Sequence, residues 1–275
     1  MKNKITFLLI LLLTYLTSFA QTVTLVQSAE NVNSSGTQVT VSFTNQPTEG
    51  NLLIAIPVTE DGNAGNQSSL ISPGWTKVTD NYFNTAGNNR RGFGYYYKIA
   101  TASEATAVTS DWTSGGDAAL AIQEFSVSGN IIGALDQFSV NNSGATQVNT
   151  INSGTTPALS GTNNLVLGLF LAKNSTPTAP AVTFTNFTNT INQNTVPDGD
   201  AITLETGFKL VSSSAAQDAN INYGTTAYAN AGVFAFSLIS DTDEDGVADN
   251  NDLDDDNDGV LDVYEQEPQF VTTVD

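Results

Sequence analysis

The chain has 275 residues and a formal net charge of −20, with 28 acidic side chains against eight basic ones. This charge, with no cluster of Lys and Arg, argues against nucleic acid as a partner, because phosphate contacts need basic groups. The chain also has no cysteine and no histidine, which excludes a disulfide framework and leaves only oxygen atoms as metal ligands.

Residues 1–20 have the pattern of a secretory signal peptide. Lysines precede the apolar run Ile5–Leu13, and the small residues Ser18 and Ala20 follow it. The run is shorter than the roughly 20 apolar residues that span a bilayer, so we expect cleavage after Ala20 and no membrane span in the mature chain. The expected location is therefore extracellular, either secreted or at a cell surface.

Residues 21–240 predict an all-β domain. They are rich in Thr, Ser, Asn, Gly and Val, and their short apolar runs are separated by turn-forming clusters without a helical period. The clearest expected strands are Thr22–Ser28, Thr37–Thr44, Leu52–Val58, Phe93–Ala100, Ala118–Ser126, Leu165–Ala172, Thr203–Val211 and Ala231–Ile239. Runs such as LLIAIPV are apolar on both alternations, which indicates strands that lie within a core.

This region consists of two related halves, residues 21–130 and 131–240. Thirty residues from Tyr97 align without a gap with those from Phe208, and NLLIAI parallels NLVLGL at a similar offset. A duplication leaves two architectures open: one large jelly-roll-like sandwich of about fourteen strands, or two tandem small sandwiches. We favour the single sandwich, because no Pro- or Gly-rich linker separates the halves. The order GNLL, GW, YYYK and EFS resembles a sandwich module of secreted bacterial proteins, and this resemblance implies no particular activity.

Few side chains of the body are candidates for chemistry. Glu124 shares its expected strand face with apolar residues and could be a shielded glycosidase acid, but no partner carboxylate can be placed beside it. We therefore favour a strand-end or calcium-bridging role for Glu124. Asp198 and Asp200 could add a calcium site. The aromatic residues could stack on sugar rings, although we expect most to be core: Trp75, Tyr95, Tyr96, Tyr97, Trp112 and Tyr223.

The stretch Asp241–Glu265 predicts two consecutive calcium-binding loops. Twelve-residue loops that begin at Asp241 and Asp254 carry carboxylates at positions 1, 3, 5, 9 and 12 and glycine at position 6. Alternate residues of a tight loop can direct oxygens at one ion, and position 7 supplies a backbone carbonyl. The candidate ligands are Asp241, Asp243, Asp245, Val247, Asp249 and Asp252 in the first loop, and Asp254, Asp256, Asp258, Val260, Asp262 and Glu265 in the second.

The spacing of the two loops and their glycines distinguish this stretch from a pair of EF-hands and from a disordered charged tail. Thirteen residues between loop starts leave no room for the flanking helices of an EF-hand, and a disordered charged tail would not need phased glycines. The stretch resembles the thrombospondin type 3 repeat in its cysteine-free bacterial form, an extended chain wound around calcium ions. The resemblance implies that the aspartates ligate calcium, with ligands shared between neighbouring ions.

Together these features predict a non-enzymatic, secreted or cell-surface calcium-binding protein. A β-sandwich recognition or adhesion module, with a surface glycan or a protein as ligand, would precede a calcium-stiffened spacer at residues 241–267. Residues 268–275 are typical of the start of a further segment. The alternatives are a lectin or carbohydrate-active enzyme on a jelly roll, and a structural component of a surface layer or matrix.

Overall fold

The computed structural model describes residues 21–33, 36–61, 69–84, 90–112, 118–174, 181–187, 189–195 and 201–265. The predicted signal peptide and the segment after residue 265 lie outside the described residues, as do Asp198 and Asp200.

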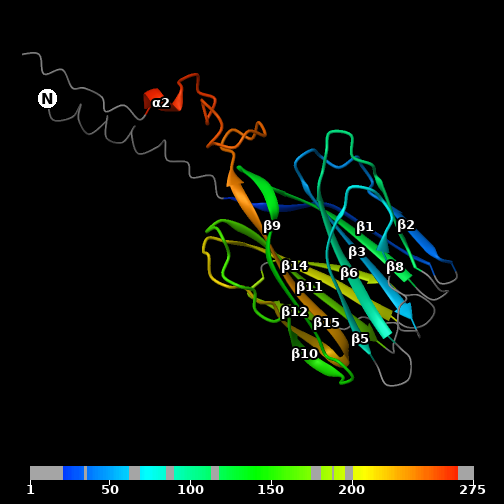
Figure 1. Cartoon of the computed structure of the whole chain (residues 1–275). Helices are drawn as coiled ribbons and strands as arrows, with labels where there is room; N and C mark the ends of the chain where they lie inside the picture. Colours follow the sequence, from blue (N-terminus) through cyan, green and yellow to red (C-terminus); the bar gives the residue numbers. More distant parts are fainter. Residues whose placement is uncertain are drawn as a thin grey trace, which may run out of the picture.

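The described residues form antiparallel strands and one helix of a single turn, so the prediction of an all-β sandwich is confirmed (Figure 1). The first half contains β1 (Val23–Asn33), β2 (Gln38–Ser42), β3 (Leu52–Asp61), β4 (Ser69–Leu70), β5 (Thr76–Asn84), β6 (Arg90–Ile99), β7 (Ala107–Asp111) and β8 (Ala118–Val127). The second half contains β9 (Asn130–Asn142), β10 (Val148–Asn152), β11 (Asn164–Asn174), β12 (Val182–Thr185), β13 (Asn189–Thr195), β14 (Ala201–Val211) and β15 (Asn220–Ser240). The helix α2 (Asp262–Glu265) follows in the acidic stretch.

Each half folds into one large and one small sheet. In the first half the large sheet has the order β1-β8-β3-β6-β5, and the small sheet has the order β2-β7-β4. The chain alternates between the two sheets, and the first and last strands of the half are neighbours. This is the arrangement of a jelly roll, with β5 kept beside β6 in the large sheet.

The second half repeats this strand order. Its large sheet places β9 beside β15, followed by β11, β14 and β13, and its small sheet places β10 and β12 on either side of β15. The single strand β15 therefore occupies the positions that β7 and β8 occupy in the first half. Its first part, from Asn220, pairs in the small sheet, and its later part, to Ser240, pairs in the large one. The strand order of the second half thus parallels that of the first half.

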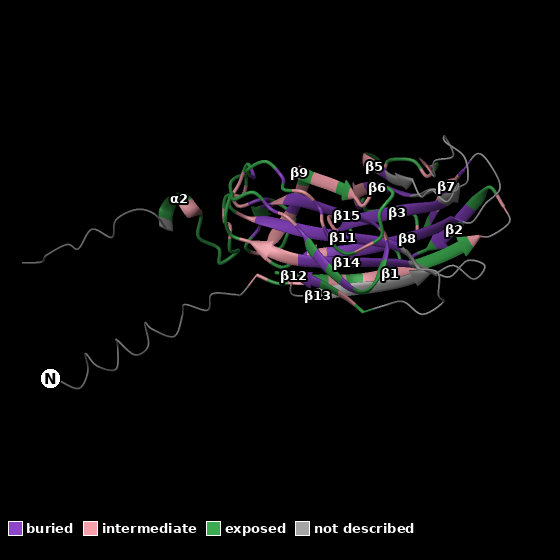
Figure 2. Ribbon diagram, turned by 90° about the horizontal axis from the view of Figure 1, so that it is seen from below, coloured by how far each residue is buried: buried purple, intermediate pink, exposed green. Residues whose placement is uncertain are grey.

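The two large sheets pack face to face through a core that both halves build, here called the shared core (Figure 2). Its buried residues from the first half are Leu52, Ile54, Ile56, Val58, Phe93, Tyr95, Ala119, Ala121, Phe125 and Val127. Those from the second half are Ile132, Leu165, Leu167, Leu169, Leu171, Leu204, Phe208, Phe234, Phe236 and Leu238. Full burial of one such Leu, Ile or Phe stabilises the fold by roughly 1.5–3 kcal/mol relative to exposure.

Aromatic pairs across the shared core follow the internal repeat. Tyr97 meets Phe236 edge to face at 5.3 Å between ring centroids, and the equivalent pair from the opposite halves, Phe208 and Phe125, meets at 5.5 Å. Between these positions the symmetry is broken, because Tyr95 stacks on Phe234. At the equivalent place, the Gln123 side chain donates a hydrogen bond to the Thr206 hydroxyl.

Each half also has an outer core between its large and small sheets. The first outer core consists of Val39, Val41, Phe43, Leu53, Ala55, Tyr96, Ala100, Val108, Trp112, Ala118, Leu120 and Ile122. The second consists of Ile151, Leu159, Val166, Phe170, Ala172, Phe184, Ala219, Ile221, Tyr223, Ala227, Ala229, Ala231, Val233 and Ala235. The molecule therefore has features of both expected architectures: each half is a small sandwich, and the two small sandwiches share one central core.

Among the described residues, no helix has the length and apolar character that crossing a bilayer requires.

Candidate metal centre

The acidic stretch begins where β15 ends, and it extends away from the sheets (Figure 1). Its two loops share the same backbone conformation at an offset of thirteen residues. Position 4 is left-handed in both, at Glu244 (φ 61°) and Asn257 (φ 55°), and position 6 is left-handed at Gly246 (φ 93°) and Gly259 (φ 89°). A Cβ at either glycine would meet no atom within 4 Å, so glycine is needed there for its backbone conformation and not for space.

The hydrogen bonds inside the loops repeat with the same period. In the first loop, Gly246 N–H donates to Asp241 Oδ2 and Val247 N–H to Asp245 Oδ1. In the second loop, the corresponding donors reach Asp254 and Asp258. The backbone thereby holds the carboxylates at positions 1 and 5 in place.

Each loop brings three carboxylates together. One carboxylate oxygen from each of Asp241, Asp243 and Asp245 lies within 4.8 Å of the other two, and the same holds for the second loop. The second set is Asp254, Asp256 and Asp258. We call these sets the first and second triad. Three negative charges so close repel one another in the absence of a cation.

The carboxylate at position 1 suits a metal ion in both triads. Asp241 is only 5% exposed, and its Oδ1 atom is buried without a hydrogen-bond partner among the described residues. Asp254 Oδ1 is also buried and unpartnered. Burial raises the pKa of Asp241, and the carboxylates of Asp243 and Asp245 raise it further, against the lowering effect of the Gly246 N–H. A buried, unpaired carboxylate oxygen is unfavourable unless a cation or a donor meets it. The residues present therefore fit a hard cation that prefers oxygen ligands.

The remaining candidate aspartates lie outside the triads. At position 9, Asp249 and Asp262 accept the N–H groups of the residues at position 2, which closes each loop. Asp252, at position 12 of the first loop, accepts the N–H groups of Leu253 and Asp254. The side chain of Glu265, at position 12 of the second loop, lies outside the described residues.

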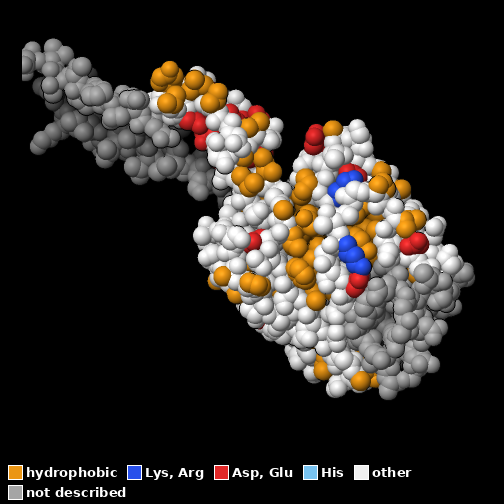
Figure 3. Space-filling view, viewed as in Figure 1, with side chains coloured by type: hydrophobic (Ala, Val, Ile, Leu, Met, Phe, Trp, Pro, Cys, Tyr) orange, Lys and Arg blue, Asp and Glu red, His pale blue; other side chains and the backbone are white. Residues whose placement is uncertain are grey.

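The valines at position 7 direct their side chains towards solvent. Val247 and Val260 are 42% and 45% exposed. Leu253, Val263 and Tyr264 are more exposed still. Figure 3 shows hydrophobic side chains on the surface of the acidic segment. The segment thus has almost no core of its own.

Sequence reasoning missed two contacts of the residues at position 4. Glu244 accepts a hydrogen bond from Gly129 N–H at 2.7 Å, and the Asn257 side chain donates to Asp243 of the first triad. The first contact joins residues 115 positions apart, so nothing in the local pattern could have indicated it. The second contact links the two loops across fourteen residues, and the spacing of the candidate ligands did not indicate it either.

In the sandwich domain, the candidate site residue Glu124 and the candidate aromatic residues have structural roles. Glu124 is fully buried, and its oxygens accept hydrogen bonds from the side chains of Gln27 and Asn51 and from Thr48 N–H. It therefore ties the turn before β3 to β8. Of the aromatic residues, Tyr95, Tyr96, Trp112 and Tyr223 are buried, and Trp75 and Tyr97 pack against the cores as partly buried residues.

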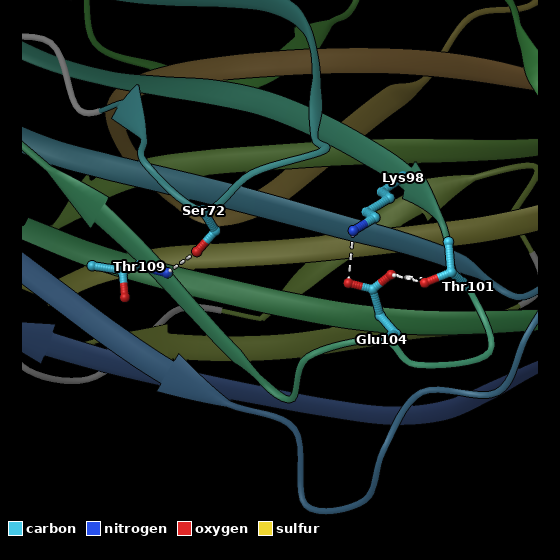
Figure 4. Close-up of polar contacts among 5 residues, drawn as sticks. All are labelled: Ser72, Lys98, Thr101, Glu104 and Thr109. Carbon is cyan, nitrogen blue, oxygen red and sulfur yellow. Dashed lines mark hydrogen bonds and ion pairs between the residues drawn. The ribbon is translucent and has the colours of Figure 1, made fainter.

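The body also holds a largely buried ion pair between Lys98 of β6 and Glu104, which lies in the loop between β6 and β7. Lys98 Nζ lies 2.7 Å from Glu104 Oε1, and Thr101 donates to the other oxygen of Glu104 through its N–H and its hydroxyl (Figure 4). Nearby, Thr109 N–H donates to the Ser72 hydroxyl (Figure 4). Burial raises the pKa of Glu104, but Lys98 and Thr101 outweigh this effect and hold the pKa below its ordinary value. The cluster is a structural ion pair at the edge of the first outer core.

Comparisons with protein-family models, with curated proteins and with solved structures find no match to this chain.

Proposed function

We propose that the protein is a secreted or cell-surface calcium-binding protein, in which the double sandwich is a recognition or adhesion module and the acidic segment is a spacer that calcium stiffens. The proposal treats the segment as a pair of repeats of the thrombospondin type 3 kind that it resembles. It rests on one observation above all: both triads contain a buried position-1 carboxylate oxygen without a partner among the described residues.

Calcium suits this arrangement better than a transition metal. The triads offer only carboxylate and backbone oxygens, and Ca²⁺ takes six to eight oxygens in flexible geometry. The chain has neither Cys nor His, the ligands that soft and borderline metals prefer. Extracellular calcium modules bind with dissociation constants of roughly 10⁻⁴ to 10⁻³ M, which matches a protein exported into millimolar calcium.

The consequence of binding is order in the segment. Because the segment buries few apolar side chains, the free energy of metal binding contributes directly to its folding. The ion removes the repulsion within each triad and holds the loop in one shape. The ordered segment then acts as a spacer of fixed length beside the sandwich.

Calorimetric titration of the metal-free full chain with calcium tests the proposal. We expect at least two ions per chain, with dissociation constants of roughly 10⁻⁴ to 10⁻³ M. The double variant Asp254→Asn, Asp256→Asn should bind one ion fewer, because it removes two carboxylates of the second triad. Circular dichroism should report increased order on addition of calcium to the original chain.

Asp255→Asn is the matched control for this titration, since it makes the same kind of charge change outside either triad. Its stoichiometry should equal that of the original chain. Absence of binding heat, or equal loss of an ion in the control and in the double variant, contradicts the proposal.

A further inference from the structure

The first acidic loop is attached to the body at the connection between its two halves. Residues Ser128 and Gly129 form the turn from β8 to β9, where the first half ends and the second begins. Asp241 N–H donates to Gly129 O at 3.2 Å, and Gly129 N–H donates to Glu244 Oε1 at 2.7 Å. The loop therefore satisfies both backbone groups of the glycine at this turn.

The same loop folds back on the end of β15. Asp249 N–H donates to Ser240 O at 3.0 Å, and Ala248 is only 8% exposed. Asp241, which begins the first triad, is 5% exposed. The metal-binding residues and the residues that touch the body thus belong to one small folded unit.

A cavity of about 730 Å³ lies beside this attachment, between the loop and the end of the sandwich. Its wall includes Glu49 and Ser126 of the body together with Asp241, Glu244 and Asp245 of the loop. The first loop therefore contacts the body through a few hydrogen bonds next to this cavity. Whether those hydrogen bonds form depends on the conformation of the loop.

In the metal-free loop, repulsion between carboxylates disfavours the conformation that contacts the body. Glu244 must adopt a left-handed conformation to reach Gly129, and it is part of a loop that already places three carboxylate oxygens within 4.8 Å. A cation at the first triad removes this repulsion and favours the conformation in which Glu244 meets the turn.

We propose that the first loop is a metal-dependent clasp: an ion held by Asp241, Asp243 and Asp245 fixes Glu244 on Gly129 and so stabilises the double sandwich itself. This inference rests on the proposed function in requiring a cation at the first triad. It goes further because a ligand stabilises only the cooperative unit that contains its site. A spacer that ordered independently of the body would leave the unfolding of the body unchanged.

Thermal unfolding of the full chain, followed by tryptophan fluorescence, tests the clasp. Both tryptophans, Trp75 and Trp112, lie in the first half of the body, so the signal does not come from the acidic segment. We expect about 10 mM calcium to raise the midpoint by about 3 to 10 °C, given the expected affinity and the size of the body. In Glu244→Ala the rise should fall to less than half, while calorimetry still shows the original number of bound ions.

Glu49→Ala is the matched control, because it removes a carboxylate from the wall of the same cavity and leaves the Glu244–Gly129 contact in place. It should keep the full calcium-dependent rise. Calcium binding without any rise in the tryptophan midpoint would overturn the clasp and leave the proposed function standing. An undiminished rise in Glu244→Ala would also overturn it, and absence of calcium binding would overturn both proposals.

Discussion

Buried acidic side chains occur in two different settings in this protein. In the body, Glu124 and Glu104 are surrounded by donors, from three different residues in the first case and from Lys98 and Thr101 in the second. In the acidic segment, Asp241 and Asp254 keep one buried oxygen free of any such donor among the described residues. An unpartnered buried oxygen also occurs at Asp80 in the body, so the feature that suits Asp241 and Asp254 to bind a cation is that each belongs to a triad of carboxylates.

The ion pair between Lys98 and Glu104 gives a prediction on pH. Because the pKa of Glu104 is below its ordinary value of 4.5, the charged form stabilises the fold at neutral pH. That contribution is present above about pH 4.5 and is lost as the pH falls through the lower, folded-state pKa. Glu104→Gln should lower the free energy of unfolding at pH 7 by about 1–3 kcal/mol in urea titrations, and by much less at acid pH.

The control for this measurement is Glu49→Gln, a carboxylate outside the ion pair, whose effect should stay within about 0.5 kcal/mol. If Glu104→Gln destabilises the protein equally at neutral and acid pH, the stabilisation comes from packing and not from charge.

The strands divide into two kinds by how clearly the sequence predicts them. All eight expected strands are present, because each contributes apolar residues to a core, and those of β3 and β11 face cores on both sides. The missed strands, such as β10 (VNTIN) and β13 (NTINQNT), lie in small sheets or at sheet edges and are rich in polar residues. A strand with one exposed face and few apolar residues has no strong period for sequence analysis to detect.

The acidic loops could be predicted for a related reason. Their thirteen-residue period, their glycines and their hydrogen bonds are all local, so the sequence contains the whole pattern. The contact between Glu244 and Gly129 is not local, and it depends on how β15 ends beside the turn between the halves. The same holds for the shared core, whose partner strands come from different halves.

Gly168 in β11 illustrates a packing limit at the scale of an element. A Cβ there would lie 2.9 Å from Phe184 Cε1 and 3.0 Å from Phe187 Cζ, so these rings would have to move. We expect Gly168→Ala to reduce the free energy of unfolding by about 1–3 kcal/mol, as measured by chemical denaturation. Gly161→Ala is the control, because its Cβ would meet nothing within 4 Å. Equal stability of the two variants would show that the aromatic rings adapt without penalty.

At the scale of the whole molecule, the duplication produces one unit with two similar parts. The large sheets of both halves build the shared core, where Tyr95 stacks on Phe234 and Gln123 bonds to Thr206. Neither large sheet is covered on this face without the other. We therefore expect the halves to unfold together and not in succession.

A destabilising substitution in one half should therefore lower the unfolding midpoint of the other half as well. Ile221 is buried in the second outer core, far from the tryptophans of the first half. Ile221→Ala should lower the midpoint of unfolding seen by tryptophan fluorescence and by far-UV circular dichroism equally, for a loss of about 2–5 kcal/mol. A fluorescence midpoint that stays unchanged while the circular dichroism midpoint falls would mean that the halves unfold independently.

The long strand β15 has a mechanical consequence. It runs from the small sheet of the second half, through the shared core, to the first acidic loop, and it is paired along its length with β10, β12, β9 and β11. Tension applied through the acidic segment would pull on this strand along its own axis. Many hydrogen bonds of β15 would then be loaded in shear at the same time, so that a tether in this place would transmit force into both sheets of the second half.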